Sequence, residues 1–222
     1  MQQFHTPAAI SAVLDIPAGL VRIVAADRAD TTVRVLPANA SKSRDVKAAE
    51  QTTVAYADGV LRIAAPAADN QYFGPSGSVE LTVQLPAGSR VEAKTADGGF
   101  RSVGRLGDVT FDGAQGAVEI EEAASARVTT QAGDVAVGRL DGSAEITTAK
   151  GGIRITEAAG GTVVLRTQAG DISVGAAAGV SAALDAGTDY GRIHNSLRNA
   201  GGTAALNIRA TTAHGDITAR SL

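Results

Sequence analysis

The sequence predicts an all-β fold: a single-domain β-solenoid in which the chain winds round a narrow core in coils of about 18–19 residues. Three observations predict this fold: a short motif recurs, apolar and polar residues alternate beside it, and glycine bounds each alternating run. The motif is Thr-x-x-Gly-x-Φ, where Φ is apolar. It occurs as TADGGF (95–100), TQAGDV (130–135), TAKGGI (148–153), TQAGDI (167–172) and TAHGDI (212–217). The steps between its starts are 35, 18, 19 and 45 residues, so we interpret the first and last steps as double.

The runs that follow the motif glycine alternate with the period of two that is typical of a half-buried strand. One side carries Val118, Ile120, Val135, Val137, Ile153, Ile155, Ile172 and Val174, and the other carries Glu119, Ala136, Arg154 and Ser173. A second run precedes each motif threonine, so one period holds two strands and two turns. Such a coil cannot bury its own apolar side and must stack on its neighbours, at the strand spacing of about 4.8 Å. Crossovers between parallel strands predict right-handed winding.

The coils are predicted to be irregular over residues 1–90 and regular over residues 91–222, within one continuous domain. Alternating runs in the first part lie at 11–19, 20–25, 31–37, 59–64, 78–88 and 89–95, with Pro-Ala-Gly turns at 17–19 and 86–88. Composition predicts loops at 38–52, 65–78 and 187–202.

Composition also excludes several functional classes. The 222 residues include 26 Gly but only 3% aromatic residues and no Trp, which suits a narrow interior. The net charge is −3 and the basic residues are scattered, so nucleic acid is not an expected partner. With no Cys, the chain has no disulfide and no thiolate chemistry.

The N-terminal stretch has no basic segment followed by an apolar core, and no run of 18 apolar residues occurs in the chain. We therefore expect a soluble, unexported, cytoplasmic protein without a transmembrane segment. If the sequence is part of a longer protein, an extracellular or envelope-associated location is expected instead.

The stretch SVELTVQLPAGSRVEAKTADGGF (78–100), followed by repeated Gly-Asp-Val/Ile units, resembles a bacterial β-strand-repeat family of unknown function. That family is labelled putative adhesin and is related to toastrack-type domains, and the resemblance covers nearly the whole chain. Its motifs are structural rather than catalytic. The resemblance therefore implies the solenoid fold and an adhesin-like or envelope-associated role.

The Gly-Asp pairs are predicted to be structural turns, in which glycine takes a positive φ and aspartate accepts a hydrogen bond from the backbone two residues on. These turn residues are Gly107, Asp108, Gly133, Asp134, Gly151, Gly152, Gly170, Asp171, Gly215 and Asp216. Calcium-binding β-rolls carry such pairs at a nonapeptide spacing. Here the spacing is 18 or more and Gly152 stands where an Asp would be needed. No metal site and no cofactor are predicted.

Other side chains receive structural interpretations as well. The motif threonines Thr95, Thr130, Thr148, Thr167 and Thr212 are expected to stack inside the coil. A hydrolase would have to combine His194 or His214 with Asp185 or Asp189 and Ser196, and the sequence has no Gly-x-Ser-x-Gly elbow. A polysaccharide-acting enzyme would need aromatic platforms that are nearly absent here.

The function predicted from these observations is a non-catalytic scaffold or binding module, with an unidentified protein or cell-envelope component as partner. Tyr72 and Phe73 either contact this partner or cover an open sheet edge. The alternative is a self-assembling solenoid, because the C-terminal GDITARSL carries no Pro and no long charged cap to block end-to-end pairing into a dimer or filament.

Overall fold

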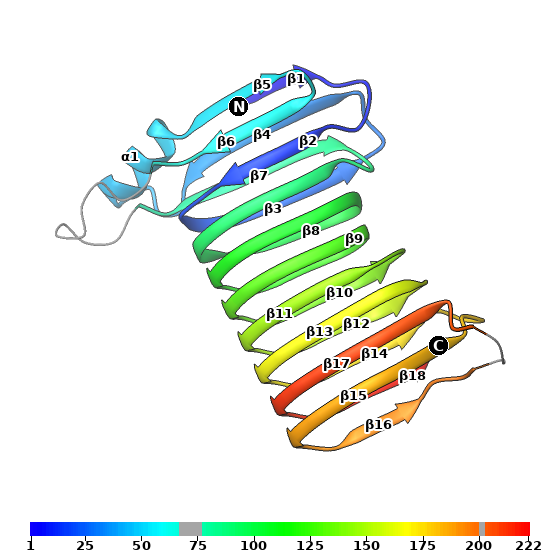
Figure 1. The fold of residues 1–222 in the computed structure, drawn as a ribbon. Helices are drawn as coiled ribbons and strands as arrows, with labels where there is room; N and C mark the ends of the chain where they lie inside the picture. Colours follow the sequence, from blue (N-terminus) through cyan, green and yellow to red (C-terminus); the bar gives the residue numbers. More distant parts are fainter. Residues whose placement is uncertain (67–76, 200–202) are drawn as a thin grey trace. The chain divides into compact units, whose positions relative to one another are not determined.

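The computed structural model describes residues 1–66, 77–199 and 203–222, which form eighteen strands and one helix. The chain folds into two compact units, Met1–Gly116 (unit 1) and Ala117–Leu222 (unit 2). Most of the described residues are in strands that wind as coils (Figure 1), and there is one short helix, so the predicted all-β solenoid is confirmed. That the coils form one continuous domain, regular from residue 91 and right-handed, stays a prediction.

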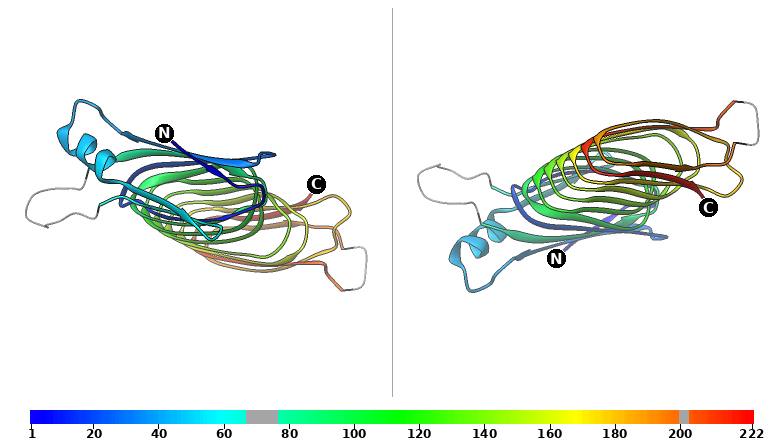
Figure 2. Two further views of the ribbon diagram at one scale, coloured as in Figure 1. Left: turned by 90° about the horizontal axis from the view of Figure 1, so that it is seen from above. Right: turned by 90° about the horizontal axis from the view of Figure 1, so that it is seen from below.

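Unit 2 consists of two parallel strand ladders that face each other across one core. Its strands are β9 (Val118–Ala132), β10 (Val135–Leu140), β11 (Ala144–Lys150), β12 (Ile153–Ala158), β13 (Gly161–Ala169), β14 (Ile172–Ala176), β15 (Ala182–Tyr190), β16 (Ile193–Ser196), β17 (Leu206–His214) and β18 (Ile217–Ser221). The first half of β9 pairs with β10 and its second half with β11, so β9 begins both ladders. Figure 2 shows the resulting coils as nested, flattened turns.

The core of unit 2 is the aliphatic row predicted from the alternation. Val135 pairs with Ile153, and Ile153 pairs with Ile172, so these side chains lie one above another. All eight residues assigned to the inner side are at most 2% exposed. Burying a side chain of this size contributes about 1.5–3 kcal/mol, so the stacked row is a large source of stability in each coil.

The last coil of the chain does not lie at the end of the stack. β17 pairs with both β13 and β15, and β18 pairs with both β14 and β16, so residues 206–221 lie between two earlier coils. The prediction of a bare edge at the C-terminal GDITARSL is therefore wrong. Within the described residues, the outermost strands at the end of unit 2 away from β9 are β15 and β16.

The predicted loop at 187–202 is wrong over residues 187–196, which belong largely to β15 and β16. TDYGRI (188–193) fits the same motif as the other coils, but its steps of 21 and 24 residues differ from the regular period and conceal it.

Unit 1 also has coils of parallel strands, but antiparallel strands lie at one end of it. Its elements are β1 (Gln2–His5), β2 (Ser11–Asp15), β3 (Ala18–Ala26), β4 (Asp30–Pro37), α1 (Ser43–Gln51), β5 (Thr53–Ala57), β6 (Val60–Ala64), β7 (Val79–Pro86) and β8 (Arg90–Gln115). The coil of β2 and β3 lies between β8 on one side and β6 with β7 on the other, all parallel. Antiparallel strands follow: β4 on β7, β1 on β4 and β5 on β6.

The predicted loop at 38–52 contains α1, which corrects the expectation. The stretch SRDVKAAEQ is polar, but Arg, Lys, Ala, Glu and Gln are good helix formers. The helix buries Asp45 and Ala48, and Asp45 Oδ1 accepts a hydrogen bond from the Ser78 backbone N–H at 3.1 Å. Tyr72 and Phe73, the predicted binding residues, lie outside the described residues.

Candidate functional site

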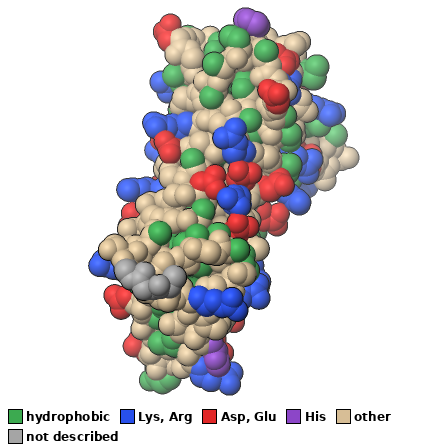
Figure 3. All heavy atoms as spheres, turned by 90° about the vertical axis from the view of Figure 1, so that its right-hand side faces the viewer, with side chains coloured by type: hydrophobic (Ala, Val, Ile, Leu, Met, Phe, Trp, Pro, Cys, Tyr) green, Lys and Arg blue, Asp and Glu red, His purple; other side chains and the backbone are tan. Residues whose placement is uncertain are grey.

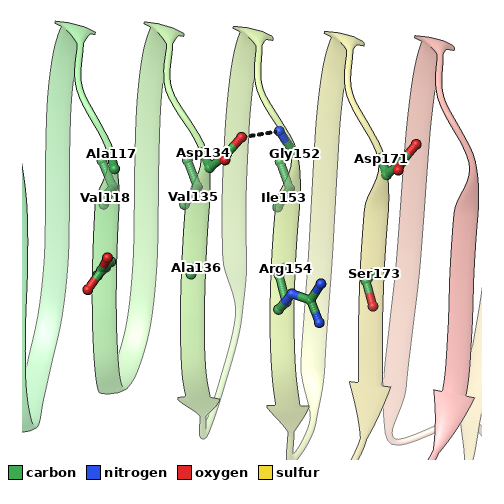
Figure 4. Close-up of a pocket in the computed structure, with 11 residues that line it drawn as sticks. Ala117, Val118, Asp134, Val135, Ala136, Gly152, Ile153, Arg154, Asp171 and Ser173 are labelled. Atoms are coloured by element: carbon green, nitrogen blue, oxygen red, sulfur yellow. Dashed lines mark hydrogen bonds between the residues drawn. The ribbon is translucent and has the colours of Figure 1, made fainter.

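A groove of about 560 Å³ crosses the outer side of β9, β10, β12 and β14 (Figure 4). All of its residues belong to unit 2. They are Ala117, Val118, Glu119, Asp134, Val135, Ala136, Gly152, Ile153, Arg154, Asp171 and Ser173. Ala136 and Gly152 have little or no side chain, and the hollow lies between the longer side chains of Glu119, Arg154 and Asp171.

The corner beside the groove is a column of glycines, one from each coil. Gly133, Gly151 and Gly170 have φ values of +147°, +144° and +154°, which L side chains rarely adopt. A Cβ on Gly151 would lie 2.2 Å from the carbonyl oxygen of Gly133, and one on Gly170 would lie 2.1 Å from that of Gly151. Only glycine lets consecutive coils approach this closely, so the corner fixes the spacing of the residues beside it.

The turn aspartates bridge consecutive coils. Asp134 Oδ1 accepts a hydrogen bond from the Gly152 backbone N–H at 2.8 Å (Figure 4). Asp171 Oδ1 accepts one from the Asp216 N–H, and Asp216 Oδ1 accepts one from the Arg192 N–H, each also at 2.8 Å. These acceptors bond to the equivalent turn position of the next coil rather than to the backbone two residues on. The carboxylates therefore have a structural partner along the stack, one coil apart.

Two of the predicted turn pairs have a different setting. Gly107 and Asp108 lie within β8 of unit 1, where Asp108 accepts a hydrogen bond from Arg90 at 2.7 Å. Neither Gly107 nor Gly152 has a positive φ, so a left-handed backbone conformation is not the reason for glycine at these two positions. Gly215 does have a positive φ of +153°.

The charges at the groove are mostly acidic. Glu119, Asp134 and Asp171 are exposed carboxylates, and Arg154 supplies one exposed guanidinium. Farther along the same corner, the Arg192 backbone N–H lowers the pKa of the Asp216 carboxyl below its ordinary value of 3.8. The groove itself offers three exposed carboxylates and one exposed guanidinium. It suits a ligand with cationic or hydroxyl groups.

The rest of the surface carries mixed charges. Figure 3 shows acidic and basic side chains interspersed over one face, without a continuous basic stripe. On the ladder opposite the groove, Glu145 lies 3.5 Å from Arg127 and 3.6 Å from Arg166. Exposed pairs of this kind contribute little to stability.

The motif threonines are buried or half-buried, and three of them form hydrogen bonds of 3.0 Å along the stack. The hydroxyls of Thr167 and Thr212 donate to the carbonyl oxygens of Gly151 and Gly170, each at 3.0 Å, and Thr188 donates to Gly215 O at the same distance. The buried hydroxyls of Thr95 and Thr130 have no hydrogen-bond partner within the described residues. The threonines therefore serve coil stacking and do not line the groove.

The residues considered for a hydrolase do not converge. Asp185 and Asp189 lie on β15, and His194 and Ser196 lie on β16, where the Ser196 hydroxyl donates to Ala219 O at 3.4 Å. His214 stacks on Tyr190, with ring centroids 4.9 Å apart. In the described ranges, no hydrogen bond joins either histidine to the serine or the aspartates. No group of three or more His, Cys, Asp or Glu suited to a metal ion occurs there either.

Sequence reasoning placed Glu119, Ala136, Arg154 and Ser173 on the outer side but did not identify them as a site. The available signal was a small residue in one coil at the position where a neighbouring coil has a longer one: Ala136 is the register partner of Glu119, and Gly152 lies beside Asp134. The pattern produces a hollow only because the register between coils sets these small residues beside longer ones on adjacent strands.

One protein-family model, described as Toastrack DUF4097, matches residues 14–221. This chain belongs to the Toastrack DUF4097 family. The match spans both units of the Toastrack chain and agrees with the resemblance drawn from the Gly-Asp coils. None of the curated proteins compared with this chain matches it.

The solved structures similar to this Toastrack chain include three that are described as adhesion proteins. A putative cell adhesion protein from Clostridium sporogenes shares 11% identity, with a TM-score of 0.42 and coverage of 100% of this chain and 98% of the other. A putative adhesin from Bacteroides fragilis shares 10% identity, with a TM-score of 0.49 and coverage of 98% and 95%. A putative adhesin from Parabacteroides distasonis shares 16% identity, with a TM-score of 0.47 and coverage of 98% and 95%. In the described part of the Toastrack chain, no helix has the length and apolar character needed to cross a membrane.

Proposed function

We propose that this Toastrack chain is a non-catalytic binding module, or scaffold, whose groove on β9, β10, β12 and β14 holds a protein or a cell-envelope component. One observation carries the proposal: the groove is a preformed polar surface, whose lining residues are fixed by stacked strands and corner hydrogen bonds. A rigid site binds with a small ordering cost, which suits recognition of a partner.

The charge of the groove indicates the class of ligand. Three carboxylates surround one guanidinium, so a ligand segment with amino or guanidinium groups would be attracted, and Arg154 would orient an acceptor next to it. An extended basic segment of a protein, or an envelope polymer with amino and hydroxyl groups, has this chemistry. An envelope partner is also what the family resemblance implies, and an extracellular or envelope location follows as part of the proposal.

Binding to purified bacterial envelope fractions and their protein components tests the proposal, with the immobilised chain as bait. Ser173→Arg fills the hollow and is expected to lower binding at least tenfold, and Arg154→Glu is expected to lower binding of ligands with an acceptor. Thr211→Arg, which adds the same side chain to an exposed position on β17 of the opposite ladder, is the matched control. Equal binding by Ser173→Arg and the control would refute the groove as the site.

The non-catalytic part of the proposal has its own test. The purified chain should show no turnover on a broad panel of hydrolase substrates. A hydrolytic activity that His194→Ala abolishes would contradict it.

A further inference from the structure

The outer edge of unit 2 leaves its core row partly uncovered. β15 pairs only with β17, and β16 pairs only with β18, so each strand has one side without a neighbour in the described residues. Ile193 is 45% exposed, whereas Ile217, its register partner in the next coil, is 1% exposed. Leu184 is likewise less buried than its partner Ile208, which is 1% exposed. One more coil stacked here would complete the core.

This edge is held in place and is not a fraying chain end. Residues 206–221 return between the outer coil and the coil before it, and pair with both. At the corner, the Arg192 N–H donates to Asp216, and the Thr188 hydroxyl donates to Gly215 O. Two preformed strands with unpaired backbone groups on one side are a template for pairing with another chain.

The edge of unit 1 contrasts with this one. There the outermost strands of the two faces, β1 and β5, meet through Phe4 and Tyr56, whose ring centroids lie 5.5 Å apart. An aromatic contact thus joins those two strands, whereas the edge of unit 2 exposes Ile193 and Tyr190, the latter by 71%.

The charges on the outer coil, formed by β15 and β16, are complementary to those of a second copy of the same chain. β15 carries the acidic residues Asp185 and Asp189, whereas the start of the β16 segment carries Arg192 and His194. Arg192 Nη2 lies 3.3 Å from Asp216 Oδ2 in an exposed pair, and the other N–H groups of the guanidinium can donate to a second carboxylate. Asp189 is exposed and forms no ion pair or hydrogen bond within the described residues. A two-fold axis along the strands would set β15 of one copy antiparallel to β16 of another, with Asp189 near Arg192 of the second copy on both sides of the axis. An axis that set β15 against β15 would instead bring like charges together.

We propose that two copies of this chain associate head to head through this edge, with β15 of each copy lying antiparallel against β16 of the other. The association adds strand pairing, covers Ile193 and Leu184, and forms the Asp189–Arg192 contact twice. It goes beyond the proposed binding function and does not use the groove.

Sedimentation velocity over a concentration series tests the proposal on the full chain. The wild type is expected to reach twice its 22.3 kDa monomer mass as concentration rises. Asp189→Arg and Arg192→Asp should each remain monomeric, because each places like charges at both contacts. An equimolar mixture of the two variants should recover the dimer, because each contact then joins opposite charges.

The mixture separates this interface from general loss of structure. Circular dichroism checks that each variant is folded, and Arg62→Asp, a reversal on the exposed side of β6, should dimerise like the wild type. The proposal is overturned if the wild type stays monomeric at all concentrations, if either single variant dimerises as well as the wild type, or if folded variants fail to associate when mixed.

Discussion

Replacing Gly170 with alanine perturbs the glycine corner on which coil stacking depends. Gly170 has a φ of +154°, and a Cβ placed on it would lie 2.1 Å from Gly151 O and 2.4 Å from Gly151 C. Both contacts are with backbone atoms, which cannot move aside as the end of a side chain could. Alanine therefore forces the coils apart, or forces the turn into another conformation.

The expected loss of stability has two parts. A non-glycine residue in a conformation of this kind costs about 1–3 kcal/mol, and forcing an added methyl group into a packed site costs about 1–3 kcal/mol more. The sum, about 2–6 kcal/mol, is a large share of the 5–15 kcal/mol that typically stabilises a folded domain.

Alanine substitutions at two other glycines of unit 2 measure the conformational cost separately from the cost of the close contact. Gly179 has a φ of +78° with nothing within 4 Å of its would-be Cβ, so Gly179→Ala should cost only the conformational part, about 1–2 kcal/mol. Gly187 lies in β15, has no positive φ and has nothing within 4 Å of its would-be Cβ, so Gly187→Ala should be neutral or slightly stabilising. Urea unfolding followed by far-ultraviolet circular dichroism gives all three values. If Gly170→Ala lost no more stability than Gly179→Ala, the close approach of the coils would not be what requires glycine.

Three further predictions concern the polar contacts between coils. Thr167→Val removes a hydroxyl that donates to Gly151 O, and should cost about 1 kcal/mol in urea unfolding. Thr130→Val removes a buried hydroxyl without a described partner, and should leave stability unchanged or higher; equal losses in the two variants would contradict this. Asp171→Ala removes the acceptor of the Asp216 N–H and should cost about 1–3 kcal/mol, whereas Asp112→Ala, at an exposed position on β8, should change stability by less than about 0.5 kcal/mol. The Arg192 N–H lowers the pKa of Asp216, so the ionised carboxylate stabilises the fold above the ordinary value of 3.8, and this is lost as pH falls through the lowered pKa. Thermal melting of Asp216→Asn should therefore depend less on pH below about 4 than that of the wild type, and an unchanged acid dependence would refute this contribution.

The coil and its core were predictable because they depend on local patterns. Period-two alternation assigned Val135, Ile153 and Ile172 to the inside, and the repeated motif placed them in register. Both patterns reflect hard constraints, namely burial on one side of a strand and glycine at a crowded corner.

The order of the coils was not predictable in this way. Every coil carries the same alternation, so any coil can stack on any other, and the pattern does not show that residues 206–221 lie between two earlier coils. The helix α1 was missed because its polar composition resembles that of a loop, although its residues favour a helix. The partners of Asp134 and Asp171 were missed because the nearest backbone donor belongs to the next coil, and local turn rules consider only nearby residues.

The groove depends on the same long-range register. Its outward residues could be assigned from the alternation, but its depth comes from Ala136 and Gly152 meeting between larger neighbours on adjacent strands. A single sequence gives the sizes of these residues and not their adjacency.

Amide hydrogen exchange across residues 182–222 tests the stacking order most directly. In the Asp189→Arg variant, which removes the proposed association, the amides of Leu206–Ser221 should exchange more slowly than those of β15 and β16, because they lie between two coils. Rapid exchange of residues 206–221, as for an unpaired chain terminus, or stronger protection of β15 and β16 than of β17 and β18, would contradict the inserted coil.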